Sequence, residues 1–182
     1  MRSELARVGA ILVTEGKTAE TDLASMIRGE HGEFRQMLAR LVCTEREWAD
    51  RRDEVFEALI IRSTAHKNAE EEAVNEPLLS AREGRTVALE MLEQHRAVAR
   101  IVKDMRPVPY DDELWLPKAK VLKMLYEAHF LSEEGGVLAD LKRFFAASEL
   151  DRITEEFEST RRSELMKRMS RLEAGTSGGV GR

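Results

Sequence analysis

A short pattern, Ala-His-x-x-x-Glu-Glu, occurs twice in this chain and constrains its fold more than any other feature. It begins at Ala65 and again 63 residues later, at Ala128, and Val74 and Leu78 recur at the same offset as Val137 and Leu141. On a helix, residues i and i+4 lie on one face, so each histidine stands over a carboxylate one turn away. Such a pair can provide two metal ligands. The two pairs are His66 with Glu70 and His129 with Glu133.

The other two histidines of the chain complete the pattern. His31 precedes His66 by 35 residues, and His95 precedes His129 by 34. The sequence therefore contains two consecutive units of the form His…His-x3-Glu, and these include every histidine in the protein. This duplication predicts two helical hairpins that are related by a pseudo-twofold axis.

Apolar residues spaced by three and four predict four long helices, at about 18–44, 45–79, 86–105 and 111–147. A fifth, charged helix is expected at about 148–172, with Ser148 and Asp151 resembling a capping box. Pro77 is expected to kink the second helix. Gly135 and Gly136 either weaken the fourth helix or allow a neighbouring helix to approach closely.

No segment has the pattern of a strand, and short connections between long helices favour an antiparallel arrangement. The predicted fold class is therefore all-α, an up-down-up-down four-helix bundle with an additional C-terminal helix. The predicted organisation is a flexible arm at 1–17, the bundle at 18–147, the packed C-terminal helix at 148–172 and a disordered tail at 173–182.

The inward face of each predicted bundle helix carries one histidine. Burying these side chains without partners would cost several kcal/mol, and a metal centre would supply a partner to each. Six side chains are too many for one tetrahedral zinc ion but suit two metals, with Glu70 and Glu133 bridging. After a shared oxo or hydroxo group is added, about two of the roughly twelve positions of two octahedral ions remain for water, dioxygen or peroxide. Nitrogen and oxygen ligands without sulfur suit iron best, with manganese or zinc as substitutes.

Composition excludes several other classes of protein. The net charge is −5 and the isoelectric point is about 5.6, which argues against nucleic-acid binding. No apolar run approaches the roughly 20 residues of a membrane span, and the N-terminal residues make a poor signal peptide, so we expect a cytoplasmic location. The single Cys43 excludes an intramolecular disulfide and a cysteine-based metal site.

Over about residues 20–170 the sequence resembles the hemerythrin-like, or HHE cation-binding, proteins. The matching stretches are 22–35, Ala65-His66-x3-Glu70-Glu71-Glu72 followed by Pro77, Gln94-His95-Arg96, and His129-x3-Glu133-Glu134. This resemblance implies a four-helix bundle that holds a non-haem diiron centre. It implies as ligands His31, His66, Glu70, His95, His129 and Glu133.

One position departs from the oxygen-carrying hemerythrins, which have a further histidine four residues after the one in the third helix. Here that position is Ala99. The acid that follows the histidine of the fourth helix also stands at +4 rather than +5. Both features are similar to the bacterial and iron-sensing members of the family, and a second exchangeable position favours reaction with dioxygen or peroxide over stable, reversible oxygen carriage.

Three further side chains are candidates to contact the ligands rather than the metal. Glu71 and Glu134 are expected either to contact the ligands or to lie in solvent. Tyr126 either lines the site or belongs to the core with a hydrogen-bonded hydroxyl. The function expected is binding of, or reaction with, dioxygen or peroxide. The alternatives are a diiron peroxidase or catalase-like enzyme, or a metal-free helical protein that binds an unknown protein partner. No pocket for an organic substrate can be recognised from the sequence.

Overall fold

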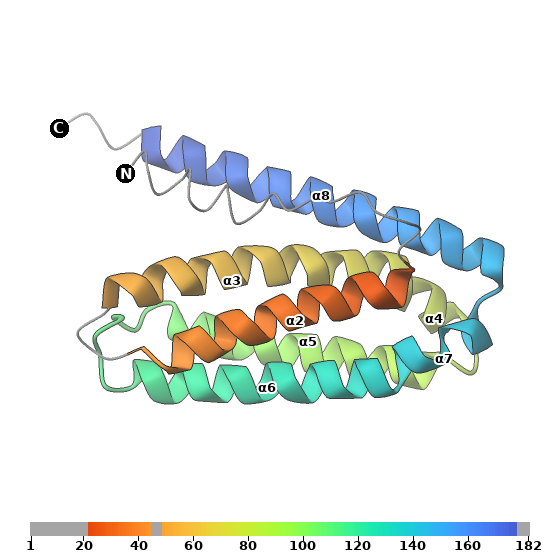
Figure 1. The fold of residues 1–182 in the computed structure, drawn as a ribbon, viewed down its shortest axis with the longest axis horizontal. Coiled ribbons are helices and arrows are strands. Elements are labelled where there is room, and N and C mark those ends of the chain that lie inside the picture. Colours follow the sequence, from red (N-terminus) through yellow and green to blue (C-terminus); the bar gives the residue numbers. More distant parts are fainter. Residues whose placement is uncertain (1–21, 45–48, 178–182) are drawn as a thin grey trace.

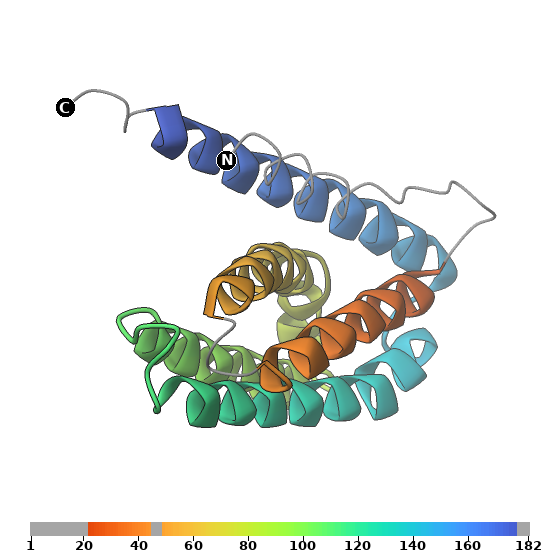
Figure 2. The same ribbon diagram turned by 60° about the vertical axis from the view of Figure 1, so that its left-hand side comes forward.

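The computed structural model describes residues 22–44 and 49–177, and within these ranges it contains helices and connections but no strand. Four long helices form the predicted up-down-up-down bundle (Figures 1 and 2), so the fold class is confirmed. The predicted arm at 1–17 lies outside the described residues. The bundle helices are α2 (Leu23–Val42), α3 (Ala49–Glu70), α5 (Arg85–Met105) and α6 (Trp115–Gly135).

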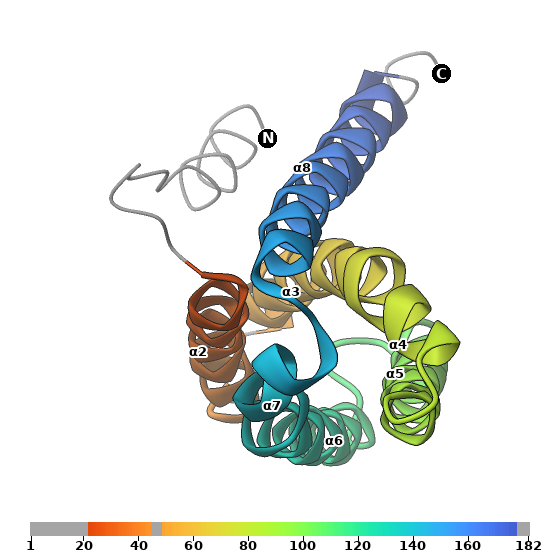
Figure 3. The same cartoon turned by 90° about the vertical axis from the view of Figure 1, so that its right-hand side faces the viewer.

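The additional C-terminal helix, α8 (Ala147–Ser177), runs along the outside of α3 (Figure 3). Ile153 and Phe157 of this helix are buried against the bundle. The backbone N–H of Ala146 donates to the Glu149 carboxylate at 2.8 Å, so Glu149 caps this helix, and the predicted pairing of Ser148 with Asp151 is wrong. The helix also extends beyond the predicted limit of 172 to Ser177, into the predicted tail at 173–182, and residues 178–182 lie outside the described residues.

Pro77 changes the end of the second bundle helix. Glu71–Asn75 form a π-helical turn, η2, which leads into the short helix α4 (Glu76–Ser80). Proline has no N–H to donate, and its ring crowds the carbonyl of the residue four positions earlier, so the preceding turn widens. The predicted kink therefore takes the form of a wide turn that begins immediately after Glu70.

The fourth predicted helix is divided into two. Helix α6 ends at Gly135 and α7 (Val137–Phe144) follows, with Gly136 between them at φ −109° and ψ −91°. A Cβ on Gly136 would lie 2.7 Å from the Ser132 carbonyl oxygen, and one on Gly135 would meet nothing within 4 Å. Gly136 therefore allows the chain to turn out of α6, whereas the position of Gly135 has room for a side chain. The two glycines do not let a neighbouring helix approach closely.

A polar layer divides the core of the bundle into two apolar clusters. On α2, Ile27 belongs to one cluster, Phe34 belongs to the other, and His31 lies between them. The same order recurs on α5, where His95 separates Met91 from Val98. The layer is therefore enclosed above and below by packed side chains. Within the described residues, no helix is long and apolar enough to cross a membrane.

Candidate metal centre

Each of the four bundle helices contributes one histidine to the polar layer, and the two glutamates of the repeated pattern join them. These six side chains are no more than 5% exposed. The structure therefore brings together every residue that the sequence predicts as a ligand. They are His31 from α2, His66 and Glu70 from α3, His95 from α5, and His129 and Glu133 from α6.

The four imidazoles form two pairs. The Nε2 atoms of His31 and His66 lie 3.2 Å apart, and those of His95 and His129 lie 3.3 Å apart. In each pair the two Nε2 atoms come from neighbouring helices and face the interior. The pairs are the two places at which nitrogen donors converge.

Both carboxylates reach across the two pairs. Glu70 lies 2.8 Å from Nε2 of His66 and 3.3 Å from Nε2 of His95. Glu133 lies 3.3 Å from Nε2 of His31 and 3.7 Å from Nε2 of His129. Each glutamate thus approaches one histidine of each pair, which is the geometry that a bridging carboxylate requires.

The outward nitrogen of every imidazole has a polar partner. The partner oxygens belong to carboxylates or a carboxamide, which accept hydrogen bonds, so each Nδ1 is assigned the proton in the neutral ring and each Nε2 lone pair points into the layer. The Nδ1-to-oxygen distances are 2.9 Å for His31–Glu134, 2.6 Å for His66–Glu30, 3.0 Å for His95–Glu71 and 3.0 Å for His129–Gln94.

Two of these four partners, Glu30 and Gln94, were not recognised from the sequence. Glu30 immediately precedes His31 and Gln94 immediately precedes His95, 64 residues later. In the same way, Glu71 immediately follows Glu70 and Glu134 immediately follows Glu133. The internal repeat therefore carried a signal for all four. Glu71 and Glu134 contact histidines, as one of their two predicted roles requires.

Two arginines lie behind this layer of partners. Arg161 of α8 pairs with Glu30 at 3.0 Å, and Arg35 pairs with Glu134 at 2.9 Å. Helix α8 is thereby connected to His66 through Glu30. Phe157 of the same helix packs edge-on against the His66 ring, with centroids 5.8 Å apart.

The hydroxyl of Tyr126 is hydrogen-bonded within the core, as one of its two predicted roles requires. Its hydroxyl donates to the Ser63 hydroxyl oxygen at 2.7 Å and to none of the six central residues. Burial raises the pKa of Tyr126 to about 12, so the phenol remains protonated. It nevertheless lines the pocket described below.

The buried carboxylates lack the partners that their burial demands. With the four rings in this neutral form, both oxygens of Glu70 and both oxygens of Glu133 are buried and accept no hydrogen bond, while Nε2 lone pairs face them. Unpartnered buried carboxylates and converging lone pairs are unfavourable unless a cation lies among them. The donor set of imidazole nitrogens and carboxylate oxygens fits divalent transition metals such as iron, so the residues present fit a metal centre.

Without a bound metal, protonated histidines supply part of the positive charge that the buried carboxylates need. Burial would lower the pKa of His66, but the charge of Glu70 and the hydrogen bond to Glu30 outweigh it and raise that pKa well above its ordinary value. Burial also opposes protonation of His95, yet Glu70 and Glu71 raise its pKa to about 9. Burial would raise the pKa of Glu70, but the charge of His66 holds it well below its usual range.

The two residues of the layer that come from α6, His129 and Glu133, have pKa values shifted toward their uncharged forms. Burial, together with the negative charge of Glu70, raises the pKa of Glu133 to about 7. Burial lowers the pKa of His129 to about 3 despite the charge of Glu70, which would raise it, and the charges of the nearby histidines lower it further. A metal ion that binds here must therefore displace protons from the layer.

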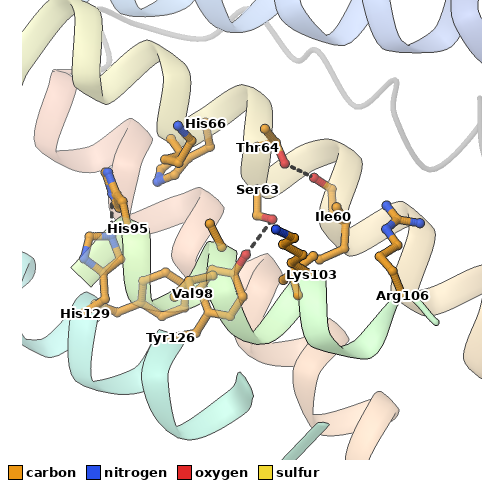
Figure 4. Close-up of a pocket in the computed structure, with 14 residues that line it drawn as sticks. Ile60, Ser63, Thr64, His66, His95, Val98, Lys103, Arg106, Tyr126 and His129 are labelled. Atoms are coloured by element: carbon orange, nitrogen blue, oxygen red, sulfur yellow. Dashed lines mark hydrogen bonds between the residues drawn. The ribbon is translucent and has the colours of Figure 1, made fainter. Parts of the chain in front are cut away.

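A pocket of about 330 Å³ opens between α3 and α5 and ends at His66, His95 and His129 (Figure 4). Ala99, which replaces the further histidine of the oxygen carriers, lines it. The sequence did not reveal this pocket, because its walls come from three helices and its shape depends on how far α3 and α5 separate.

Comparison with known proteins agrees with this geometry. The family model described as "Hemerythrin HHE cation binding domain" matches residues 22–141. That range begins at the cap of α2 and ends within α7, so it includes all six central residues. Searches of curated proteins and of solved structures found no match.

Proposed function

Because this chain belongs to the hemerythrin HHE cation-binding family, we propose that it is a non-haem diiron protein that binds or reacts with dioxygen or peroxide. The observation that carries this proposal is the pair of buried, unpartnered carboxylates, each of which approaches both histidine pairs. Two iron ions would supply redox chemistry with dioxygen or peroxide, and manganese or zinc could substitute as bound ions.

Each residue of the layer has a distinct part in this proposal. His31 and His66 would hold one ion, and His95 and His129 the other. Glu70 and Glu133 would bridge the two, because each lies between the pairs. The four acceptors on the Nδ1 atoms orient the rings and increase the basicity of Nε2, which favours metal binding.

The pocket between α3 and α5 gives access to the layer. The apolar clusters close the bundle above and below, α8 covers α3, and the pocket between α3 and α5 reaches three of the histidines. A small molecule in this pocket would contact Ala99 and the side chains of His66, His95 and His129.

Metal content is the direct test of the proposal. After anaerobic loading with ferrous iron and removal of free metal, we expect about two iron ions per chain, because six ligands exceed the needs of one ion. Elemental analysis with the protein concentration from amino-acid analysis gives the ratio. One ion or fewer per chain would contradict the dinuclear centre, and absence of any bound metal would favour the metal-free interaction protein.

The pocket beside Ala99 favours a second candidate function, a catalase-like activity that disproportionates peroxide without another reductant. Substituting Ala99→His would place an imidazole one turn from His95 and within the same pocket. We expect this substitution to slow peroxide consumption by about tenfold or more, since a nitrogen ligand would occupy a position that peroxide needs.

Wild type and Ala99→His are compared at equal iron content by following peroxide loss and dioxygen release. Ala139→His, at an exposed position of α7, is the matched control and should keep the wild-type rate. Equal rates in all three proteins, or a wild type that binds dioxygen reversibly without being oxidised, would exclude the catalase-like function and leave oxygen binding.

A further inference from the structure

We propose that the pocket between α3 and α5 binds an amphipathic organic anion, a medium-chain aliphatic carboxylate, whose chain lies along the pocket and whose carboxylate pairs with Lys103. This site goes beyond reaction with dioxygen or peroxide. Binding depends on the walls of the pocket and does not require a bound metal.

The pocket is larger than a dioxygen or peroxide ligand needs. Its volume is about 330 Å³, whereas one water molecule occupies about 30 Å³ in the liquid. Pockets for small organic molecules begin at about 300 Å³. The space therefore matches a small organic ligand that lies next to the metal-binding layer.

The walls of the pocket are mainly apolar. Aliphatic and aromatic side chains dominate them, from Ile60 of α3, Val98 and Val102 of α5, and Phe130 of α6. The wall hydroxyls bond within the protein. Tyr126 donates to Ser63 at 2.7 Å, and Thr64 donates to the Ile60 carbonyl at 2.6 Å. An aliphatic chain fits such a surface, because burying it removes apolar area from water without leaving polar groups unpaired.

The charged residues that line the pocket are all cationic. Lys67 forms an ion pair with Glu71 at 3.0 Å, and Arg106 forms one with Glu57. Lys103 makes no ion pair or hydrogen bond with the part of the chain that the structure describes, and Figure 4 shows its side chain directed from α5 toward Ser63. Its charge is therefore available to an anionic ligand.

The positions of Lys103 and the histidines set the length and orientation of the ligand. Lys103 follows His95 by two turns of α5, which is about 12 Å along the helix axis. A carboxylate at Lys103 therefore directs an extended aliphatic chain along Val102 and Val98 toward the histidines. The apolar end of the ligand, not its carboxylate, faces the metal-binding layer.

Calorimetric titration of the full-length protein with decanoate tests the proposal, with decylammonium as the probe of opposite charge and butyrate as the short one. We expect one decanoate per chain, and at least tenfold weaker binding of both other probes. Equal affinity for decanoate and decylammonium would overturn the proposed role of charge. Equal affinity for butyrate would overturn the role of the apolar walls.

Two substitutions with matched controls locate the site. Ala99→Trp should fill the pocket and Lys103→Glu should repel the carboxylate, each lowering decanoate affinity by about tenfold or more, whereas Lys103→Arg should retain it. Ala139→Trp and Lys120→Glu, both at exposed positions outside the pocket, should bind as wild type does. Far-UV circular dichroism confirms that the variants are folded.

Wild-type affinity in both Ala99→Trp and Lys103→Glu would overturn the proposal. The proposal would also be overturned if decanoate changed the optical spectrum of the iron-loaded protein and its affinity did not respond to Lys103→Glu, because its carboxylate would then bind the metal. Failure of iron loading is a separate result, since decanoate is titrated into the protein as purified.

Discussion

Replacing either Glu70 or Glu133 with alanine should eliminate binding of both metal ions, the largest effect that we expect from any single substitution. Each carboxylate lies within 4 Å of a histidine from each pair, so in the proposed centre its loss would remove an oxygen ligand from both ions together. Removing one histidine leaves the second ion with its own ligands. Iron content after anaerobic loading and dialysis measures the effect.

The neighbouring acids provide graded controls for this experiment. Glu72 is exposed next to the layer, and Glu72→Ala should keep two ions per chain. Glu71 accepts from Nδ1 of His95, and Glu71→Ala should weaken metal binding by about 10- to 100-fold, as loss of a partner behind a ligand typically does. Normal iron content in both Glu70→Ala and Glu133→Ala would rule out the bridging assignment.

Removal of metal should lower the melting temperature substantially. A ligand present at 1,000 times its Kd stabilises the folded state by about 4 kcal/mol, and about 1 kcal/mol corresponds to roughly 2–4 °C for a chain of this size. We therefore expect a decrease of roughly 10 °C or more when a chelator strips the iron-loaded protein. Glu70→Ala, which should bind no metal, serves as the control and should melt at the same temperature with and without chelator.

The two forms should also respond differently to pH. The raised pKa values of His66 and His95 stabilise the metal-free fold fully below the ordinary value of 6.5, and the contribution of His95 is lost as the pH rises toward about 9. The metal-free protein should thus melt at lower temperatures as the pH rises through this window. Metal binding requires deprotonated ligands and strengthens with pH, so the difference in melting temperature between the two forms should widen.

Differential scanning fluorimetry of both forms between pH 6.5 and 9 measures this difference. The depressed pKa of His129 acts below pH 6.5, and the raised pKa of Glu133, about 7, contributes only at the lower edge of this window. The change in the upper part of the window therefore reports on His66 and His95. A melting temperature that does not change when all metal is removed would show that the layer is not coupled to folding.

The helices and the six central residues could be predicted from the sequence because both depend on local spacing. A histidine and a glutamate four residues apart must share a helix face wherever that helix packs. His31 and His95 lie in rows of apolar residues spaced by three and four, so burying those rows carries each imidazole inward with them. Burial of the layer followed from the amphipathic pattern alone.

Only the tertiary structure decided which groups meet between helices. Glu30 is adjacent to His31 in the chain but hydrogen-bonds His66 on another helix, and Arg161 reaches Glu30 from α8. Such contacts depend on the rotation and separation of the helices and on side-chain rotamers. The helical periodicity and the residue spacing of the sequence do not specify these. The pocket arises in the same way, because the separation of α3 from α5 beside Ala99 results from the packing of the whole bundle.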